Sequence, residues 1–298
     1  MVNVRDLAVL HFESKHLSLV LAPSVGGSIA RLDSVTETGL WPVLRGTGGT
    51  PMNVLEMGSF PLVPYSNRIR GGRFTFRGRE VRIAANMPPD LSPLHGQGWL
   101  GAWDVVATDE SSAELAFRHE PGEWHWRYEA RQQFRLSDHA LDVRLTCRNL
   151  SDDAMPCGLG QHPYFHCGAE TRLDTQVKGA WEIDENVLPV GRVPAKHRYE
   201  LRDRLVCGQS LDHGFDGWGG RATIRTPGAP FVVEMSSPEA TCFQLYSPAN
   251  GGIFVAEPVS HTNAALNAPE EEWPRLGLRV LEPGEEMALE MRLAILPA

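Results

Sequence analysis

The chain has 298 residues, of which 42% are hydrophobic and 22% charged, and its formal net charge at pH 7 is −9. These values are typical of a folded globular protein and exclude a disordered or membrane-embedded class. The acidic balance and the lack of a long basic run argue against nucleic acid or an anionic membrane surface as a partner. A chain of this length buries enough surface to hold a core without disulfides or metals.

Two features of the sequence indicate a cytoplasmic location. Residues 1–19 contain no apolar stretch long enough for a signal peptide, and no run of 18 apolar residues occurs anywhere. Five cysteines, an odd number without any C-x-x-C pair, are typical of reduced structural thiols in a cytosolic protein: Cys147, Cys157, Cys167, Cys207 and Cys242. We therefore expect a cytoplasmic protein with free thiols.

Apolar and polar residues alternate along most of the chain, which is the period of half-buried strands. The pattern starts at residues 17–21. Residues 74–83 predict a β-hairpin with its turn at the centre. Residues 126–134 and 141–147 predict two strands joined by a short turn, and residues 287–295 predict a last half-buried strand.

The overall pattern predicts an all-β fold. No stretch longer than about ten residues keeps the i, i+3, i+4 spacing of a helix. The 29 glycines and 22 prolines separate short strands, as in a sandwich or a barrel. The alternation predicts antiparallel sheets with one face buried and the other partly wet. Without a linker, a charge block or a repeat, residues 1–298 are expected to form a single domain.

Five segments are rich in residue types that are not typical of strands, and together they contain most of the polar residues that are candidates for a functional site. We expect them to be loops and strand ends, where sites on an all-β scaffold are usually built. They are residues 64–74, 93–103, 158–168, 210–220 and 254–267.

Metal and nucleophilic chemistry are poorly supported. His162 and His166 are four residues apart, but Pro163 and the strand period place them roughly 13 Å apart at about 3.3 Å per residue, too far to share a zinc ion. The sequence has no H-E-x-x-H, no G-x-S-x-G and no phosphate-binding glycine loop. We therefore expect no metal site.

General acid–base chemistry is the remaining class. It needs one group that takes a proton and another that gives one near neutral pH. His95, His162, Asp212 and Glu257 all lie in segments rich in glycine, proline and aromatic residues, and Arg68 supplies a fixed cation. Each also has a structural explanation: a buried histidine, a turn, a loop cap, a strand end or a surface ion pair.

Aromatic residues beside these groups favour a carbohydrate pocket, because flat rings stack on the C–H faces of sugars. A folded core uses aromatics as well, so the pattern has two explanations. The residues are Tyr65, Trp99, Trp103, Tyr164, Phe165 and Trp218.

At these positions the sequence resembles the aldose 1-epimerase (galactose mutarotase) family. The resemblance spans roughly residues 60–290 and rests on motifs that occur in the family's order: NRIRGGRF, LHGQGW, HPYF, LDHGF, AEPVSHTNAALN and RVLEPGEEM. It implies a large single-domain β-sandwich that binds a sugar across a concave sheet face. It also implies interconversion of α and β anomers without a cofactor, by a monomer or a homodimer.

The resemblance assigns roles to individual residues. His162 of HPYF corresponds to the general acid that protonates the ring oxygen, and Glu257 of AEP to the base that takes the C1 hydroxyl proton. In that scheme the two groups lie on opposite sides of the acetal carbon. His95, Arg68 and Asp212 correspond to groups that hold the ring oxygen and the hydroxyls.

The remaining expectations concern neighbours of these groups and the substrate. We expect Asn67, Trp99 and Tyr164 to line the substrate site as well. Asp216 stands in a context similar to that of Asp212 and is the alternative for its role. A hexose 6-phosphate enzyme would gather extra cations, for which Arg70 is a candidate together with Arg73. A sugar-binding domain without activity is the third possibility.

Overall fold

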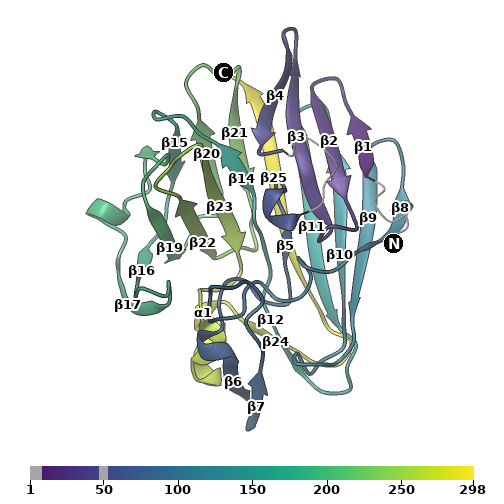
Figure 1. Cartoon of the computed structure of the whole chain (residues 1–298), viewed down its shortest axis with the longest axis vertical. Coiled ribbons are helices and arrows are strands. Elements are labelled where there is room, and N and C mark those ends of the chain that lie inside the picture. Colours follow the sequence, from purple (N-terminus) through teal and green to yellow (C-terminus); the bar gives the residue numbers. More distant parts are fainter. Residues whose placement is uncertain (1–8, 47–52) are drawn as a thin grey trace.

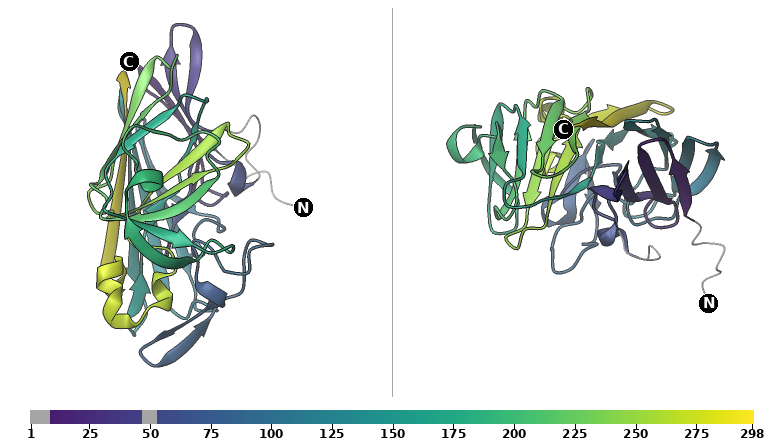
Figure 2. Two further views of the ribbon diagram at one scale, coloured as in Figure 1. Left: turned by 90° about the vertical axis from the view of Figure 1, so that its left-hand side faces the viewer. Right: turned by 90° about the horizontal axis from the view of Figure 1, so that it is seen from above.

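Strands with alternating side chains form two large antiparallel sheets that pack face to face (Figures 1 and 2). The computed structural model describes residues 9–46 and 53–298. One row of side chains from each strand enters a shared interior, so that a continuous apolar cluster includes residues of both sheets. This arrangement confirms the prediction of an all-β protein built as a large antiparallel β-sandwich.

The first sheet carries the candidate site. Within the described residues it has 12 strands. Ten of them follow one another in the order β1 (Leu10–Glu13), β2 (Leu17–Ala22), β3 (Ser28–Thr36), β4 (Gly39–Leu44), β14 (Tyr164–His166), β23 (Ile253–Val259), β22 (Cys242–Ser247), β19 (Leu211–Asp216), β16 (Gly179–Ile183) and β17 (Pro189–Pro194). The other two are β13 (Gly160–Gln161), which pairs with β23, and β5 (Pro61–Leu62), which pairs with β13.

The second sheet closes the other side of the core, and β25 runs through the middle of the molecule in Figure 1. Its strand order is β18 (Arg204–Leu205), β15 (Arg172–Thr175), β20 (Arg221–Arg225), β21 (Phe231–Ser236), β25 (Glu286–Pro297), β11 (Ala140–Asn149), β10 (Tyr128–Leu136), β9 (Ser112–His119) and β8 (Asp104–Thr108).

The remaining elements are short. Two strand pairs lie outside the large sheets: β12 (Met155–Cys157) with β24 (Arg279–Leu281), and β6 (Arg73–Phe76) with β7 (Arg79–Arg82). The helical elements are α1 (Trp273–Leu276) and the 3-10 turns Val54–Glu56, Arg70–Gly72, His197–Tyr199, Ala265–Asn267 and Glu270–Glu272. Among the described residues, no helix has the length and apolar character that crossing a bilayer requires.

The hairpin predicted at residues 74–83 is present as β6 and β7. Phe74 pairs with Val81 across it. The two turn residues, Arg77 and Gly78, have φ angles of 48° and 75°. Two consecutive positive φ angles are the geometry of the tight turn that matches strand twist, and glycine adopts it without steric cost.

The four other predicted strands are also present, as β2, β10, β11 and β25. Their exposure differs from the prediction in one respect. Every residue of β2 is buried, and so are six of the seven residues of β23. The expectation of one solvent-facing side is therefore wrong for these strands, because apolar residues of other segments cluster with their outward side chains: Met57 with Val20 of β2, and Phe60 with Val255 of β23.

The segments 158–168, 210–220 and 254–267, predicted as loops and strand ends, contain strands. Asp212 lies within β19 and Glu257 within β23, in the interior of the first sheet. Gly214 and Pro258 weakened the strand signal in these segments, since both residue types are uncommon inside strands. The candidate carboxylates therefore project from a rigid sheet rather than from loops.

The prediction of five free thiols is wrong for one pair. Cys167, just after β14, and Cys207, after β18, form a disulfide with a Cα–Cα distance of 5.6 Å. Their separation of 40 residues gave no signal in the sequence, because only the packing of the two sheets brings the loops together. Cys147, Cys157 and Cys242 are free and buried, as expected.

Candidate active site

Three neighbouring strands place polar side chains on one face of the first sheet. Glu257 of β23 pairs with Gln244 of β22, which pairs with Gly214 of β19. Residues opposite each other in an antiparallel pair share a face, and so do residues two apart along a strand. Asp212 therefore lies on the same face, where the Gln244 side-chain amide donates a hydrogen bond of 2.5 Å to its Oδ1 atom.

His162 reaches Glu257 from the strands next to β23 in the same sheet. It lies between β13 and β14, which both pair with β23. The backbone N–H of His162 donates to the carbonyl of Phe60, whose ring stacks on the imidazole at 4.4 Å. The Nε2 atom of His162 is 3.5 Å from Oε1 of Glu257. The two groups are therefore neighbours, which corrects the expectation that they face each other across the acetal carbon.

Burial sets the protonation of this pair. His162 and Glu257 are 8% and 3% exposed. Desolvation, with a smaller contribution from the Asp212 charge, raises the pKa of Glu257 well above its usual range. Desolvation also lowers the pKa of His162 to about 3. Burial therefore favours the neutral form of both groups, an uncharged imidazole beside a protonated carboxyl.

Two loops fold against each other to place His95. The backbone N–H of His95 donates to the carbonyl of Asn67, and the N–H of Asn67 donates to Nδ1 of His95 at 3.0 Å. The Nδ1 atom is thus an acceptor, so the ring proton is on Nε2. Burial lowers the pKa of His95 well below its usual value, which keeps it neutral. Its ring meets that of His162 edge to face at 5.3 Å.

Gly96 allows this close approach of the two loops. Its φ angle is +72°, and a Cβ atom there would lie 2.1 Å from the carbonyl oxygen of Val63. We expect Gly96→Ala to lower the free energy of unfolding by about 2–4 kcal/mol, because it adds backbone strain and a clash with rigid backbone. Urea denaturation followed by circular dichroism measures this change.

Gly71→Ala is the matched control for that substitution. Gly71 also has a positive φ, +63°, but among the described residues no atom lies within 4 Å of its Cβ position. Only the left-handed backbone should then cost stability, about 1 kcal/mol. Equal losses for the two variants would show that the contact between the loops does not require Gly96.

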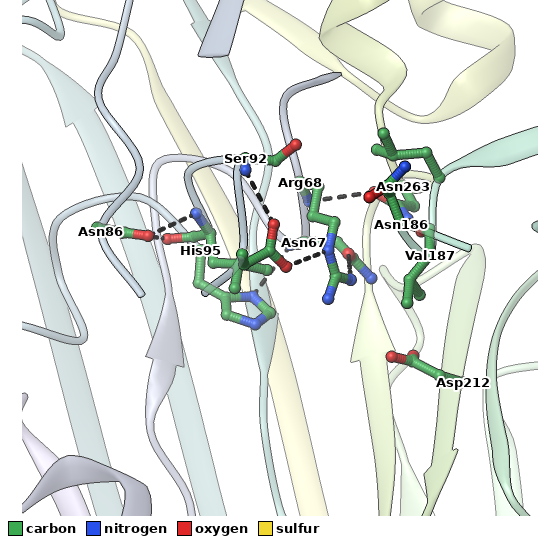
Figure 3. A network of polar contacts seen from close by, with 12 residues as sticks. Asn67, Arg68, Asn86, Ser92, His95, Asn186, Val187, Asp212 and Asn263 are labelled. Carbon is green, nitrogen blue, oxygen red and sulfur yellow. Dashed lines mark hydrogen bonds and ion pairs between the residues drawn. The ribbon is translucent and has the colours of Figure 1, made fainter. Parts of the chain in front are cut away.

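Arg68 lies between His95 and Asp212 in the view of Figure 3. Its backbone N–H donates to Oδ1 of Asn263, and the amide of Asn263 donates to the carbonyl of Val187. Its guanidinium donates from Nη1 to Oδ1 of Asn67 at 3.1 Å. The backbone of Arg68 is therefore anchored to Asn263, and its guanidinium lies against Asn67.

The structure separates the two candidate aspartates. Asp212 lies near Arg68, whose charge opposes the burial that raises the pKa of this aspartate. Asp216 instead forms a bidentate pair with Arg192, at 2.6 and 2.7 Å. Asp212 is thus the aspartate associated with the other candidate residues, while Asp216 holds the outer strand β17.

The remaining candidate residues surround the pair. Asn67 is 6% exposed and adjoins Arg68. Tyr164 is 8% exposed; its ring is 4.7 Å from that of His162 and lies under the guanidinium of Arg45 at 3.7 Å. Trp99 is 1% exposed, and its Nε1–H donates to the carbonyl of Leu94. Its ring meets the ring of His95 edge to face at 5.9 Å.

Most of the aromatics that suggested a sugar platform are core residues. Tyr65 packs on Trp124, Trp103 on Phe117, Phe165 on Phe254 and Trp218 on Phe243, and all eight lie in or against the main apolar cluster. The core explanation is therefore correct for these four aromatics. Of the predicted six, only Tyr164 and Trp99 approach the histidines.

Several residues of the site escaped prediction. Phe60 stacks on His162, Gln244 bonds Asp212, Asn263 anchors Arg68, and Arg45 covers Tyr164. Gln244 looks like any polar residue of a strand, and Phe60 like any core aromatic. Only Asn263 carried a signal, since it lies in the same motif as Glu257, six residues later.

The comparisons with known proteins identify the family. A sequence model described as aldose 1-epimerase matches residues 9–294. The chain belongs to the aldose 1-epimerase family. The uncharacterized protein YphB of Escherichia coli K12 is 33% identical over 272 residues, 86% of this chain and 91% of that protein. Galactose mutarotase of Mus musculus is 28% identical over 167 residues, 51% of this chain and 48% of the mouse protein.

Solved structures of the family share the fold. An Escherichia coli K12 protein described as a candidate aldose 1-epimerase superposes with a TM-score of 0.87 at 29% identity, covering 98% of this chain and 99% of that one. A galactose mutarotase-like protein of Clostridium acetobutylicum superposes with a TM-score of 0.82 at 17% identity, covering 99% and 100%. The second likeness shows the fold alone.

Proposed function

We propose that the protein is an aldose 1-epimerase, an isomerase that interconverts the α and β anomers of a free hexose or pentose. The observation that carries the proposal is the buried pair of His162 and Glu257, whose Nε2 and Oε1 atoms are 3.5 Å apart. Sugar binding alone does not require a buried carboxyl in contact with an imidazole. Burying a carboxyl costs stability, so this arrangement needs another reason. Acid–base catalysis does require such groups.

Anomerisation needs one proton taken from O1 and one delivered to the ring oxygen O5. Both oxygens are bonded to C1, so two catalytic groups that lie side by side can serve them together. The two members of the pair are in contact, so a proton given up by one of them lies within reach of the other. One member gives a proton to O5 while the other takes the proton of O1.

The bond changes then balance without any other reactant. The O5–C1 bond breaks, the C1–O1 bond becomes a carbonyl, and the pair holds as many protons as before. Rotation about C1–C2 presents the other face of the aldehyde to O5, and closure reverses both transfers. Each transfer to or from a positioned side chain typically accelerates a reaction by about 10²–10⁴-fold.

The pKa shifts bear on which residue acts first as the acid. Because burial favours a neutral His162 and a protonated Glu257, the carboxyl is the better group to donate to O5 and the imidazole the better group to accept from O1. The family scheme, with His162 as the acid, needs the proton to move to the imidazole first. The 3.5 Å contact makes that transfer short, and a bound sugar supplies hydroxyls that stabilise the charged form.

The cations around the site favour a free sugar over a sugar 6-phosphate. In the described part of the chain, Arg45 donates to the Met57 carbonyl, Arg68 is paired with Asp90, and Arg70 is close to Asp184. Arg73 lies exposed at the start of β6. Residues 47–52 contain no lysine or arginine. A phosphate would therefore have to displace existing partners of Arg45, Arg68 and Arg70.

Asp212→Asn tests recognition of the sugar hydroxyls. A carboxylate accepts stronger hydrogen bonds from hydroxyls than an amide does, so we expect kcat/KM to fall about 10- to 100-fold. Asp216→Asn removes a carboxylate from the same strand that is bound to Arg192, and it should exchange anomers at the wild-type rate. The reverse order of effects would assign the role to Asp216.

The proposal is tested by following anomer exchange by NMR over a panel of aldoses and their 6-phosphates. Acceleration of exchange for free aldoses is the expected result. Acceleration for the 6-phosphates only would favour the sugar-phosphate alternative. If the protein binds sugars without changing the exchange rate of any, the assignment as an enzyme is wrong and a non-catalytic binding domain replaces it.

A further inference from the structure

Arg68 is held by a carboxylate from a separate loop. Its Nε atom donates to Oδ2 of Asp90 at 2.7 Å, and the two side chains are only 12% and 17% exposed. The second carboxylate oxygen of Asp90, Oδ1, accepts the backbone N–H of Ser92 at 2.9 Å. Asp90 is thereby fixed at both oxygens, one by its own turn and one by the arginine.

These contacts define which guanidinium atoms remain for a substrate. Nε is used by Asp90, and Nη1 donates to Asn67. Among the described residues, Nη2 of Arg68 has no hydrogen-bond acceptor within reach. The planar guanidinium is therefore fixed along one edge while the opposite end is open. In Figure 3 that end lies on the side of Asp212.

Without Asp90, the guanidinium of Arg68 could pair with the carboxyl groups of Asp212 and Glu257. Its charge already acts on Asp212 and on Glu257, lowering the pKa of each against the effect of burial. A long side chain freed from its clamp would turn toward these carboxyl groups, because pairing with a cation stabilises their ionised form. Such a pair would occupy the place of the sugar and would pull the proton from Glu257.

We propose that Asp90 is a positioning residue that holds the Arg68 guanidinium in its sugar-binding orientation and prevents it from pairing with the carboxyls of the site. The inference rests on the proposed function, because the orientation matters only if Arg68 binds the substrate. It assigns a role to the MPPDLSP segment, residues 87–93, which carried no signal for a site in the sequence.

Asp90→Asn is the variant that tests this role. The asparagine oxygen can still accept from Ser92, so the turn is kept, while the amide can no longer neutralise Nε of Arg68. We expect kcat/KM for anomer exchange to fall about 10- to 100-fold, as for misplacement of a binding group by about 1 Å. Circular dichroism should show an unchanged fold, and Asp90→Glu should restore part of the rate.

Two further readouts separate positioning from a structural role. The alkaline limb of the pH–rate profile should move down by about half to one pH unit, because Arg68 then acts on Glu257 without the offsetting charge of Asp90. The groups that face Glu257 and titrate or carry charge are His162, His95, Tyr164, Asp212 and Arg68. In an Arg68→Met background, Asp90→Asn should cost nothing further.

The control is Asp216→Asn, which breaks an Asp–Arg pair of the same kind, with Nε of Arg192 at 2.6 Å, away from the pair of His162 and Glu257. It should leave the rate and the pH profile unchanged. Wild-type kinetics in both Asp90→Asn and Asp90→Ala would overturn the inference, as would an equal loss in the Arg68→Met background. An inactive wild-type protein would instead overturn the proposed function.

Discussion

Glu257→Gln is expected to lower the rate of anomer exchange by about 10²–10⁴-fold while making the protein more stable. The rate falls because the amide can neither give nor take a proton at Oε1, the atom that contacts His162 at 3.5 Å. The free energy of unfolding rises by about 1–2 kcal/mol at pH 8, because the variant has an amide that carries no charge at any pH. The carboxyl that it replaces is buried, and its Oε2 atom has no hydrogen-bond partner among the described residues. Polarimetry and urea denaturation measure the two effects.

The stability difference between Glu257→Gln and wild type should depend on pH. Burial raises the pKa of Glu257 in the folded state above 4.5, its usual value. The native state therefore binds this proton more tightly, and the stabilisation is complete below pH 4.5 and is lost as pH rises through the folded pKa. The stability advantage of Glu257→Gln should thus be small at pH 5 and should grow toward pH 8.

Two outcomes would contradict this account of Glu257. A variant that exchanges anomers at the wild-type rate shows that the carboxyl is not a catalytic group. A stability difference that shrinks between pH 5 and pH 8 shows that the folded protein prefers the ionised carboxylate. Glu234→Gln, at an exposed position on β21 of the second sheet, controls for the loss of one negative charge.

His162→Asn is expected to lower the exchange rate by a similar factor, about 10²–10⁴-fold, because asparagine removes the imidazole that contacts Glu257 and cannot give or take a proton in its place. The ring of Phe60 also loses its stacking partner, which costs roughly 0.5–1.5 kcal/mol. NMR exchange measurements at saturating sugar separate the loss of chemistry from a loss of binding, since kcat should fall while KM changes little.

The stability of the His162 variant should depend on pH in the opposite direction from that of Glu257→Gln. The folded pKa of His162 is about 3, below its usual value of 6.5, so the unfolded chain binds this proton more readily. Wild-type stability is therefore lost as pH falls below 6.5, and the Asn variant escapes that loss. His139→Asn, at an exposed turn, is the control. Parallel stability curves for wild type and His162→Asn between pH 7 and pH 4 would refute burial of a neutral imidazole.

The sequence by itself determined the fold class and the types of side chain available for catalysis. The two-residue period of β2, β10, β11 and β25 is a local property, because each strand must present alternate side chains to the core. The hairpin at residues 74–83 was determined by its turn residues. The types of residue that could do acid–base chemistry were also readable, since only a few side chains titrate near neutral pH.

Only the tertiary structure decided which of these residues meet. Cross-strand register depends on partners 87–91 residues apart in the chain, such as Tyr164 and Val255. It puts Glu257 beside His162 and leaves Asp216 bound to Arg192. The same non-local packing joins Asp90 to Arg68 and Cys167 to Cys207.

Burial then decided the protonation of the pair. An exposed glutamate and an exposed histidine would be ionised and partly ionised at neutral pH. On the buried sheet face, desolvation instead favours the neutral form of each of the two residues. The sequence contains the groups, but desolvation is a property of the folded surroundings, and those form only when both sheets and their loops are assembled.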